Sequence, residues 1–184
     1  SNDGQKLFLY IENGMILKYV YNSAQRRWNL DFQIEVINGG ECRIATNANG
    51  SKTYIVCGRD SIKVLSGTTL SALPNTQRDG SNNDYFWESI RTSDSGNEVM
   101  ALGGTAYMVR TVYKSTNAGA SFTPITTINN AALSAVTAMD ISADGNASFI
   151  ATEEPTIGVS ATTFYTQHGK TAPWYKREES YNWI

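Results

Sequence analysis

The stretch Ser142-Ala143-Asp144-Gly145 decides the fold, because the chain contains it in four variants. The other copies are Ser1-Asn2-Asp3-Gly4, Asn47-Ala48-Asn49-Gly50 and Ser93-Asp94-Ser95-Gly96. Their glycines stand at positions 4, 50, 96 and 145, so successive copies are 46, 46 and 49 residues apart. A period of this length indicates a repeat architecture, in which each repeat is one supersecondary unit.

Each copy has the chemistry of a hairpin turn. A Ser or Asn at the first position accepts a hydrogen bond from the backbone two residues on, and a Gly at the fourth position adopts a positive φ. Four residues after each glycine, a bulky residue stands within an apolar run: Phe8, Tyr54, Met100 and Phe149. Apolar runs of this length predict buried strands. We therefore predict that the turn forms the first hairpin of each repeat.

A second landmark follows later in each repeat, most clearly between Tyr113 and Phe122. This segment resembles the Asp-box (BNR repeat) of β-propellers, Ser-x-Asp-x-Gly-x-x-Trp. Ser115 and Gly119 match the pattern, Asn117 replaces its Asp and Phe122 replaces its Trp. The other repeats keep the spacing, from Tyr19 to Trp28, Val64 to Leu73 and Tyr165 to Trp174.

We interpret the residues of this box as structural. The short side chains of Ser115 and Asn117 satisfy backbone groups of their own turn, and Gly119 takes the left-handed conformation. Phe122, and with it Trp28 and Trp174 at the same position, is expected to fill the gap between neighbouring blades.

The resemblance implies an all-β fold, a β-propeller of four four-stranded antiparallel blades in a single domain. The repeats cover about 1–40, 41–86, 87–135 and 136–184. The first repeat begins at its turn, so its innermost strand is missing. We expect residues 181–184 to return and complete this blade, which closes the ring; the alternative is that the chain belongs to a longer propeller. Long connections are expected at 29–40, 74–86, 123–134 and 175–182.

Composition excludes several classes of partner. The formal charge of −2 and the pI near 5.4 give no electrostatic reason for nucleic-acid binding. No apolar run approaches the length of a membrane span, so we expect no membrane insertion. Cys42 and Cys57 flank the second turn on the two strands of one hairpin, and both a disulfide and a pair of buried free thiols are open at this point.

The candidate binding residues lie in the predicted loops. In propellers, the loops between the second and third strands share one face with the connections between repeats, and loops on a rigid scaffold often carry function. The loop 58–61 and the residues 153–155 are assigned to this face. The candidates are Arg59, Asp60, Arg78, Asp79, Tyr85, Glu153 and Glu154.

The sequence favours a non-enzymatic binding or structural module that recognises a protein or a glycan, without cofactor or metal. We expect an extracellular or virion component, with membership of a larger assembly as a further option. The alternative is a sialidase-like glycoside hydrolase or a sugar-binding lectin. A sialidase-like site requires three arginines, a Tyr–Glu pair and an acid–base Asp. Arg43 resembles part of the Arg-Ile-Pro signature without its proline, and His168 is the single histidine, which excludes a multi-histidine metal site.

Overall fold

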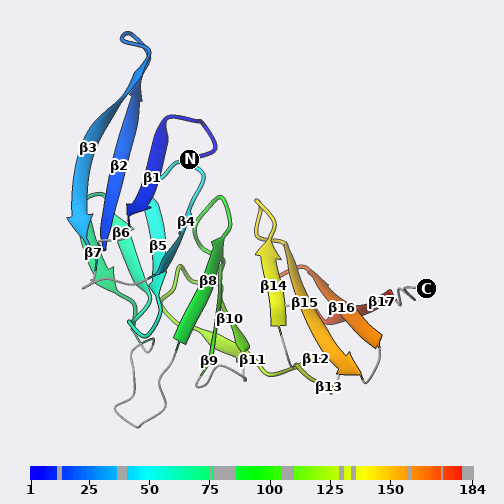
Figure 1. Ribbon diagram of the computed structural model, residues 1–184. Helices are drawn as coiled ribbons and strands as arrows, with labels where there is room; N and C mark the ends of the chain where they lie inside the picture. The colour runs from blue at the N-terminus through cyan, green and yellow to red at the C-terminus, as the bar shows by residue number, and fades with distance from the viewer. Residues whose placement is uncertain are drawn as a thin grey trace.

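The computed structural model describes residues 1–11, 14–36, 41–74, 76, 86–104, 110–128, 131–133, 136–156, 159–170 and 172–179. Its strands form four antiparallel sheets and one short two-stranded ladder (Figure 1). In these ranges the structure is all-β, and no helix is long and apolar enough to cross a membrane.

The sheets follow one another along the chain. The first sheet has three strands, β1 (Lys6–Ile11), β2 (Met15–Asn22) and β3 (Arg27–Glu35). The second has four, β4 (Cys42–Thr46), β5 (Lys52–Cys57), β6 (Lys63–Ser66) and β7 (Thr69–Ala72). The third consists of β8 (Phe86–Thr92), β9 (Val99–Gly104), β10 (Thr111–Ser115) and β11 (Thr123–Ile125), and the fourth of β14 (Val136–Ile141), β15 (Ala147–Thr156), β16 (Val159–His168) and β17 (Trp174–Glu179). The ladder joins β12 (Thr127–Ile128) to β13 (Ala131–Ala132).

The four repeated turns are hairpin turns, as predicted. In each, the glycine N–H donates to the carbonyl of the first turn residue, at 3.1, 2.9, 3.0 and 2.9 Å in chain order. The glycines have φ values of 65°, 62°, 73° and 73°, which a Cβ atom would strain. The last three turns join the innermost strand of a sheet to its second strand, whereas the first precedes β1. The first sheet therefore lacks its innermost strand among the described residues, which agrees with the prediction.

Neighbouring sheets pack face to face through three apolar clusters. Phe8 and Ile16 of the first sheet pack with Ile55 of the second. Tyr54 lies in the cluster between the second and third sheets, and Met100 in the cluster between the third and fourth. The bulky residue four positions after the turn glycine thus faces the next sheet along the chain, and alternation within the strand turns its neighbours toward the preceding sheet.

The turns themselves are joined across the sheets by backbone hydrogen bonds. Asn2 N–H donates to the Ala48 carbonyl at 2.7 Å, Ala48 N–H to the Asp94 carbonyl at 3.0 Å, and Asp94 N–H to the Ala143 carbonyl at 2.7 Å. These four residues occupy the second position of their turns. We call this series the turn ladder; it fixes the spacing of the four sheets at one end.

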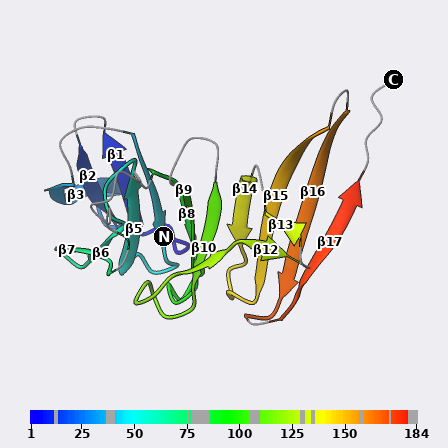
Figure 2. The same cartoon turned by 90° about the horizontal axis from the view of Figure 1, so that it is seen from below.

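The sheets form an open arc rather than a closed ring. Figure 2 shows the first and fourth sheets at opposite ends of the arc, with the second and third between them. The predicted closed propeller of four four-stranded blades is therefore corrected to one three-stranded and three four-stranded sheets without closure. The segment 181–184, expected to close the ring, lies outside the described residues.

Three of the predicted connections contain strands. Residues 29–35 belong to β3, residues 123–125 to β11, and residues 175–179 to β17. These are the outermost strands of their sheets. Their many polar residues suit strands that meet water along one edge, and because of these polar residues the segments were predicted as connections.

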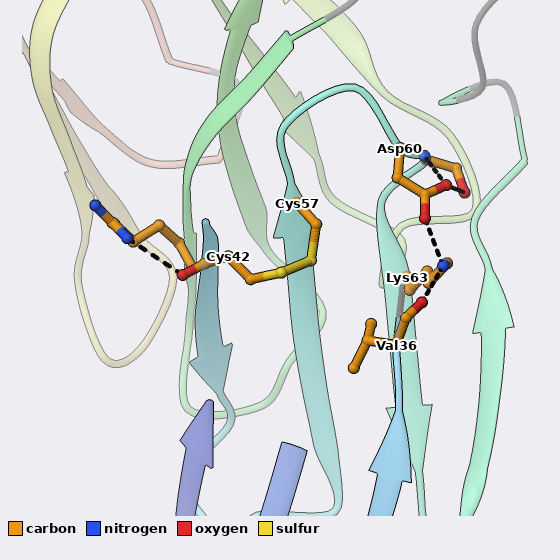
Figure 3. Close-up of a disulfide and its surroundings, with 7 residues drawn as sticks. Val36, Cys42, Cys57, Asp60 and Lys63 are labelled. Atoms are coloured by element: carbon orange, nitrogen blue, oxygen red, sulfur yellow. Dashed lines mark hydrogen bonds and ion pairs between the residues drawn. A yellow bond between two sulfur atoms is a disulfide. The ribbon is translucent and has the colours of Figure 1, made fainter. Parts of the chain in front are cut away.

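Cys42 and Cys57 form a disulfide (Figure 3). They are directly paired across β4 and β5, with Cα atoms 4.2 Å apart. This register places both side chains on the same face of the second sheet, in the cluster against the first sheet. The question that the sequence left open is thereby settled in favour of the bridge.

Candidate functional site: a charged groove on the loop face

The candidate site lies at the end of the sheets opposite the turns. We call this end the loop face; it carries the connection from β5 to β6 and the beginnings of the innermost strands β4 and β8. A groove of about 300 Å³ opens there between the second and third sheets. Its lining residues are Glu41, Arg43, Phe86, Trp87, Glu88 and Arg110.

Trp87 lines this groove and belongs to the core cluster between the second and third sheets. It is 4% exposed, and its backbone N–H donates to the Gly58 carbonyl at 2.7 Å, which joins the start of β8 to the second sheet. Its ring meets that of Tyr113 edge-on, with centroids 5.2 Å apart. Gly103 is required beside it, because a Cβ atom there would lie 2.6 Å from the indole ring. These contacts fix the Trp87 ring within the core beneath the groove.

Glu88 and Arg110 form the best-defined ion pair of the groove. The Arg110 Nε atom lies 3.0 Å from the Glu88 carboxylate, and the two side chains are 40% and 22% exposed. The pairing of β8 with β9 shifts between Trp87 and Ser89, so Glu88 is the extra residue of a β-bulge. Bulges redirect a side chain locally and are common beside functional sites.

Arg43 supplies the charges on the other side of the groove. Its neighbour in β5 is Val56, which packs toward the third sheet, so the guanidinium leans the same way. It forms an ion pair with Glu41 and donates to the Cys42 carbonyl at 3.2 Å. The groove thus combines two guanidinium groups, two carboxylates and the partly exposed Phe86, and its formal charges cancel.

Of the loop residues predicted to bind a ligand, Asp60 is held by the scaffold. Its carboxylate lies 2.6 Å from Lys63 Nζ and accepts from the Ser61 N–H at 2.7 Å. Lys63 also donates to the Val36 carbonyl at 2.6 Å, so this pair ties the first sheet to the second (Figure 3). Arg59 lies beside it in the connection between β5 and β6, as expected.

Glu153 and Glu154 are not loop residues. Both lie within β15, where they pair with Thr162 and Ala161 of β16. The hairpin simply continues past them, because the paired strands are ten residues long. Arg78, Asp79 and Tyr85 fall outside the described residues.

The box-like turn after β10 is held together by its own side chains. Ser115 Oγ accepts hydrogen bonds from the N–H groups of Gly119 and Asn117 at 2.9 and 3.3 Å, and Asn117 Oδ1 accepts from Ser121 N–H at 2.9 Å. Gly119 has φ of 84° and lies against Leu73 of the second sheet. Phe122 packs on the cluster between the second and third sheets.

The aromatic residues at the box position have different surroundings. Trp174 packs on the cluster between the third and fourth sheets, as expected. Trp28 was expected to fill a gap between blades, but it is 41% exposed and contacts Tyr21 with ring centroids 5.4 Å apart. The physical reason is its place in the first sheet, on the face that has no preceding sheet.

A second group of charges lies between the third and fourth sheets at the turn end. The Glu98 side chain is 1% exposed and pairs with Lys170. Burial opposes ionisation of Glu98, but hydrogen bonds from Lys170, Ser93 and Ser95 outweigh it and hold the pKa of the carboxyl below its ordinary value. Lys114, whose pKa burial lowers, donates to Ser148 Oγ at 3.0 Å. All these contacts are internal, so this cluster joins sheets rather than binding a ligand.

In the described ranges, no three His, Cys, Asp or Glu side chains are grouped so as to hold a metal ion. His168 is exposed at the end of β16. The groove residues Glu41, Phe86, Glu88 and Arg110 were not predicted from the sequence. For Glu41, Phe86 and Glu88, the signal that could have found them is their position at the start of an innermost strand; Arg110 instead precedes β10, the third strand of its sheet.

Comparison with known proteins identifies the fold. A scan against protein-family models matches none, and a search of curated proteins finds no relative. Among solved structures, the GH74 enzyme of Niastella koreensis has a TM-score of 0.58 at 13% identity, over 91% of this chain and 28% of that one. TolB from Acinetobacter baumannii has a TM-score of 0.57 at 13% identity, over 100% of this chain and 42% of that one.

A third similar structure is dihydro-heme d1 dehydrogenase NirN, with a TM-score of 0.57 at 10% identity, over 99% of this chain and 46% of that one. All three are β-propeller proteins. At these identities the similarity shows a propeller-like fold and nothing of activity. The chain spans less than half the length of each.

Proposed function

We propose that the chain is a non-enzymatic binding module whose groove on the loop face recognises a glycan or a polar segment of a protein. The observation that carries this proposal is the groove between the second and third sheets, where the partly exposed Phe86 lies beside the Glu88–Arg110 and Glu41–Arg43 pairs. Exposed aromatic side chains bind the apolar faces of sugars and side chains, and fixed charged groups orient hydroxyl and amide groups.

The charge balance of the groove favours a neutral ligand. Both arginines already face a carboxylate, Arg43 with Glu41 and Arg110 with Glu88. A strongly charged ligand would have to displace one of these partners and leave it unpaired. A chain of hydroxyl groups or peptide amides can instead accept from the guanidinium groups and donate to the carboxylates.

A glycan array followed by calorimetric titration of the best ligand tests this proposal. Arg110→Ala and Glu88→Ala should each weaken binding by about tenfold or more, because each removes a charge-assisted hydrogen bond and frees its partner. Asp31→Ala is the matched control, since it removes a partly buried ion pair with Lys18, at 2.6 Å, in the first sheet and away from the groove. Unchanged affinity in both groove variants would refute this site.

Glycoside hydrolysis is the second candidate, because the groove brings together two carboxylates, Glu41 and Glu88. Paired carboxylates are the catalytic groups of most glycosidases. A panel of fluorogenic glycosides separates the two functions: turnover that Glu88→Gln abolishes would establish an enzyme, and binding without turnover would support the module.

Two further features support the proposed repeat family and the proposed setting of the chain. The hydrogen bonds of Ser115, Asn117 and Gly119 support membership of the Asp-box group. The Cys42–Cys57 disulfide supports an extracellular or virion setting, because such bridges persist in oxidising surroundings.

A further inference from the structure

We propose that the ligand of the groove on the loop face is a neutral sugar ring, of which Arg110 and Glu88 together recognise two adjacent hydroxyl groups. This inference rests on the proposed function, because it names the class of ligand for the same site. The evidence is that, within the described residues, the Arg110 guanidinium group uses only one of its three nitrogen atoms.

Arg110 keeps most of its hydrogen-bond donors for a ligand. Its Nε atom lies 3.0 Å from each carboxylate oxygen of Glu88, whereas its two Nη atoms have no acceptor among the described residues. These two atoms carry four N–H groups. Because the guanidinium group is planar, two of the N–H groups form a fork that fits a pair of neighbouring oxygen atoms. The side chain lines the groove and is 40% exposed, so a ligand can reach this fork.

The second arginine of the groove, Arg43, is less available. One of its Nη atoms pairs with Glu41, and the other donates to the Cys42 carbonyl at 3.2 Å. Both ends of its fork are therefore engaged by the protein. The two arginines thus differ in what they can offer, and Arg110 is the one that we expect to determine the specificity of the groove.

Glu88 supplies acceptors beside the donors of Arg110. Both of its carboxylate oxygens face the same donor, Arg110 Nε, so each oxygen keeps a further lone pair for another hydrogen bond. A hydroxyl group is donor and acceptor at once, so it can accept from Arg110 Nη and donate to Glu88. A second, adjacent hydroxyl group can accept from the other end of the fork. Two neighbouring hydroxyl groups therefore match this ion pair.

Phe86 provides an apolar surface next to the ion pair. Phe86 and Glu88 lie two residues apart at the start of β8, and both line the groove. The Phe86 ring is partly exposed, and its Cε2 atom would lie 3.5 Å from a Cβ atom added to Gly58. Ligand sites commonly combine such an aromatic surface with a few placed polar groups. A sugar ring has the same two parts, because C–H groups cover its face and hydroxyl groups surround its edge.

Charge and size favour a neutral sugar over an acidic ligand and over a peptide. An acidic ligand would bring its negative charge close to Glu41 and Glu88, and like charges repel. A peptide would lose the freedom of each side chain that it orders on binding. The groove measures about 300 Å³, a small volume for a ligand site, which suits a compact and rigid ring.

NMR titration of the protein with a panel of neutral methyl pyranosides tests this inference. We expect at least one pyranoside to shift the amide resonances of Phe86, Trp87 and Glu88 in a saturable way. Its deoxy analogue, which lacks one of two adjacent hydroxyl groups, should bind at least about tenfold more weakly, because a hydrogen bond to a charged group is lost. Arg110→Lys keeps the positive charge beside Glu88 but has no planar fork, so it should bind the sugar and the deoxy analogue with nearly equal affinity.

Arg91→Lys is the matched control. Arg91 is exposed on the same strand, β8, but it lies 3.7 Å from Asp140 and does not line the groove. This variant should discriminate between the two sugars as the wild type does. Equal binding of sugar and deoxy analogue by the wild type, discrimination that survives in Arg110→Lys, or discrimination that is lost in Arg91→Lys would each overturn the inference.

Panels of peptides and of acidic sugars separate this inference from the proposed function. Groove resonances that respond to a peptide or an acidic sugar, but to no neutral pyranoside, would overturn the ligand class and leave the binding module standing. Groove resonances that respond to none of the three panels would count against both. A pyranoside that binds without shifting the groove resonances would also overturn the inference, since its site would lie elsewhere.

Discussion

Replacing Tyr54 by phenylalanine should separate the hydrogen bond between the second and third sheets from their apolar contact. The Tyr54 hydroxyl donates to the Gly96 carbonyl at 2.6 Å, and the side chain is 0% exposed. The variant keeps the ring but leaves this buried carbonyl without its donor. An unsatisfied buried acceptor costs about 1–3 kcal/mol, so we expect the free energy of unfolding to fall by about 2 kcal/mol.

Tyr165→Phe is the matched control. Tyr165 is 3% exposed and lies in the cluster between the third and fourth sheets, but its hydroxyl has no hydrogen bond to a described residue. Its loss should change stability by less than about 0.5 kcal/mol. Urea titrations of both variants measure the difference, which corresponds to a melting temperature lower by about 4–8 °C for Tyr54→Phe alone. Equal effects of the two substitutions would refute the reasoning.

The same residue has a signature at high pH. Burial raises the pKa of Tyr54 from 10.0 to about 12. Because the folded value is the higher one, the stabilisation from its neutral form is complete below pH 10 and is lost as the pH rises toward 12. Ultraviolet titration of the folded protein should show a late-ionising tyrosine that is missing in Tyr54→Phe. A titration curve identical in the two proteins would contradict the burial of this hydroxyl.

Three further predictions concern the turns, the disulfide and the buried carboxyl. Gly145→Ala should lower the free energy of unfolding by about 3 kcal/mol, because the added Cβ would lie 2.4 Å from Glu98 Oε2. Gly4→Ala adds only the strain of its positive φ, about 1 kcal/mol. Equal melting temperatures for the two variants would contradict this difference. Changing both Cys42 and Cys57 to Ala should cost about 3 kcal/mol, the value for a bridge with a separation of 15 residues, and a reductant should have the same effect on the wild type alone. The pKa of Glu98 is lower in the folded protein than its unfolded value near 4.5, so ionised Glu98 stabilises the fold above that pH, and this stabilisation is lost as the pH falls through the folded pKa. Glu98→Gln should therefore flatten the acid side of a plot of unfolding free energy against pH. An unchanged acid side would argue against the ion pair.

The sequence predicted those parts of the fold that local chemistry determines. The Ser or Asn and Gly of each turn specify a positive φ and a short-range hydrogen bond, so the hairpins could be placed to the residue. The missing innermost strand of the first sheet was predicted from the position of the first turn, which lies at the start of its repeat. Closure could not be predicted in this way, because it depends on the angle between packed sheets and not on any one turn.

The outer strands and the groove were missed for physical reasons. The outermost strands meet water along one edge, so their polar residues resembled connections. Glu153, Glu154 and a following proline are uncommon in strands, yet the length of the β15–β16 hairpin includes them. The direction of Glu88 depends on a bulge, and a shift of one residue reverses every side chain beyond it. For the same reason, alternation alone did not establish that Cys42 faces Cys57.

The turn ladder also explains how the repeats can differ so much in sequence. Its hydrogen bonds join peptide groups of Asn2, Ala48, Asp94 and Ala143, to which the Asn2 side chain adds one hydrogen bond to the Asp94 carboxylate at 2.7 Å. Every amino acid except proline carries the same N–H and carbonyl, so mutation of these side chains leaves the contact intact. The alignment of the sheets is thus fixed by main-chain hydrogen bonds. Substitutions can therefore accumulate at these positions without separating one repeat from the next.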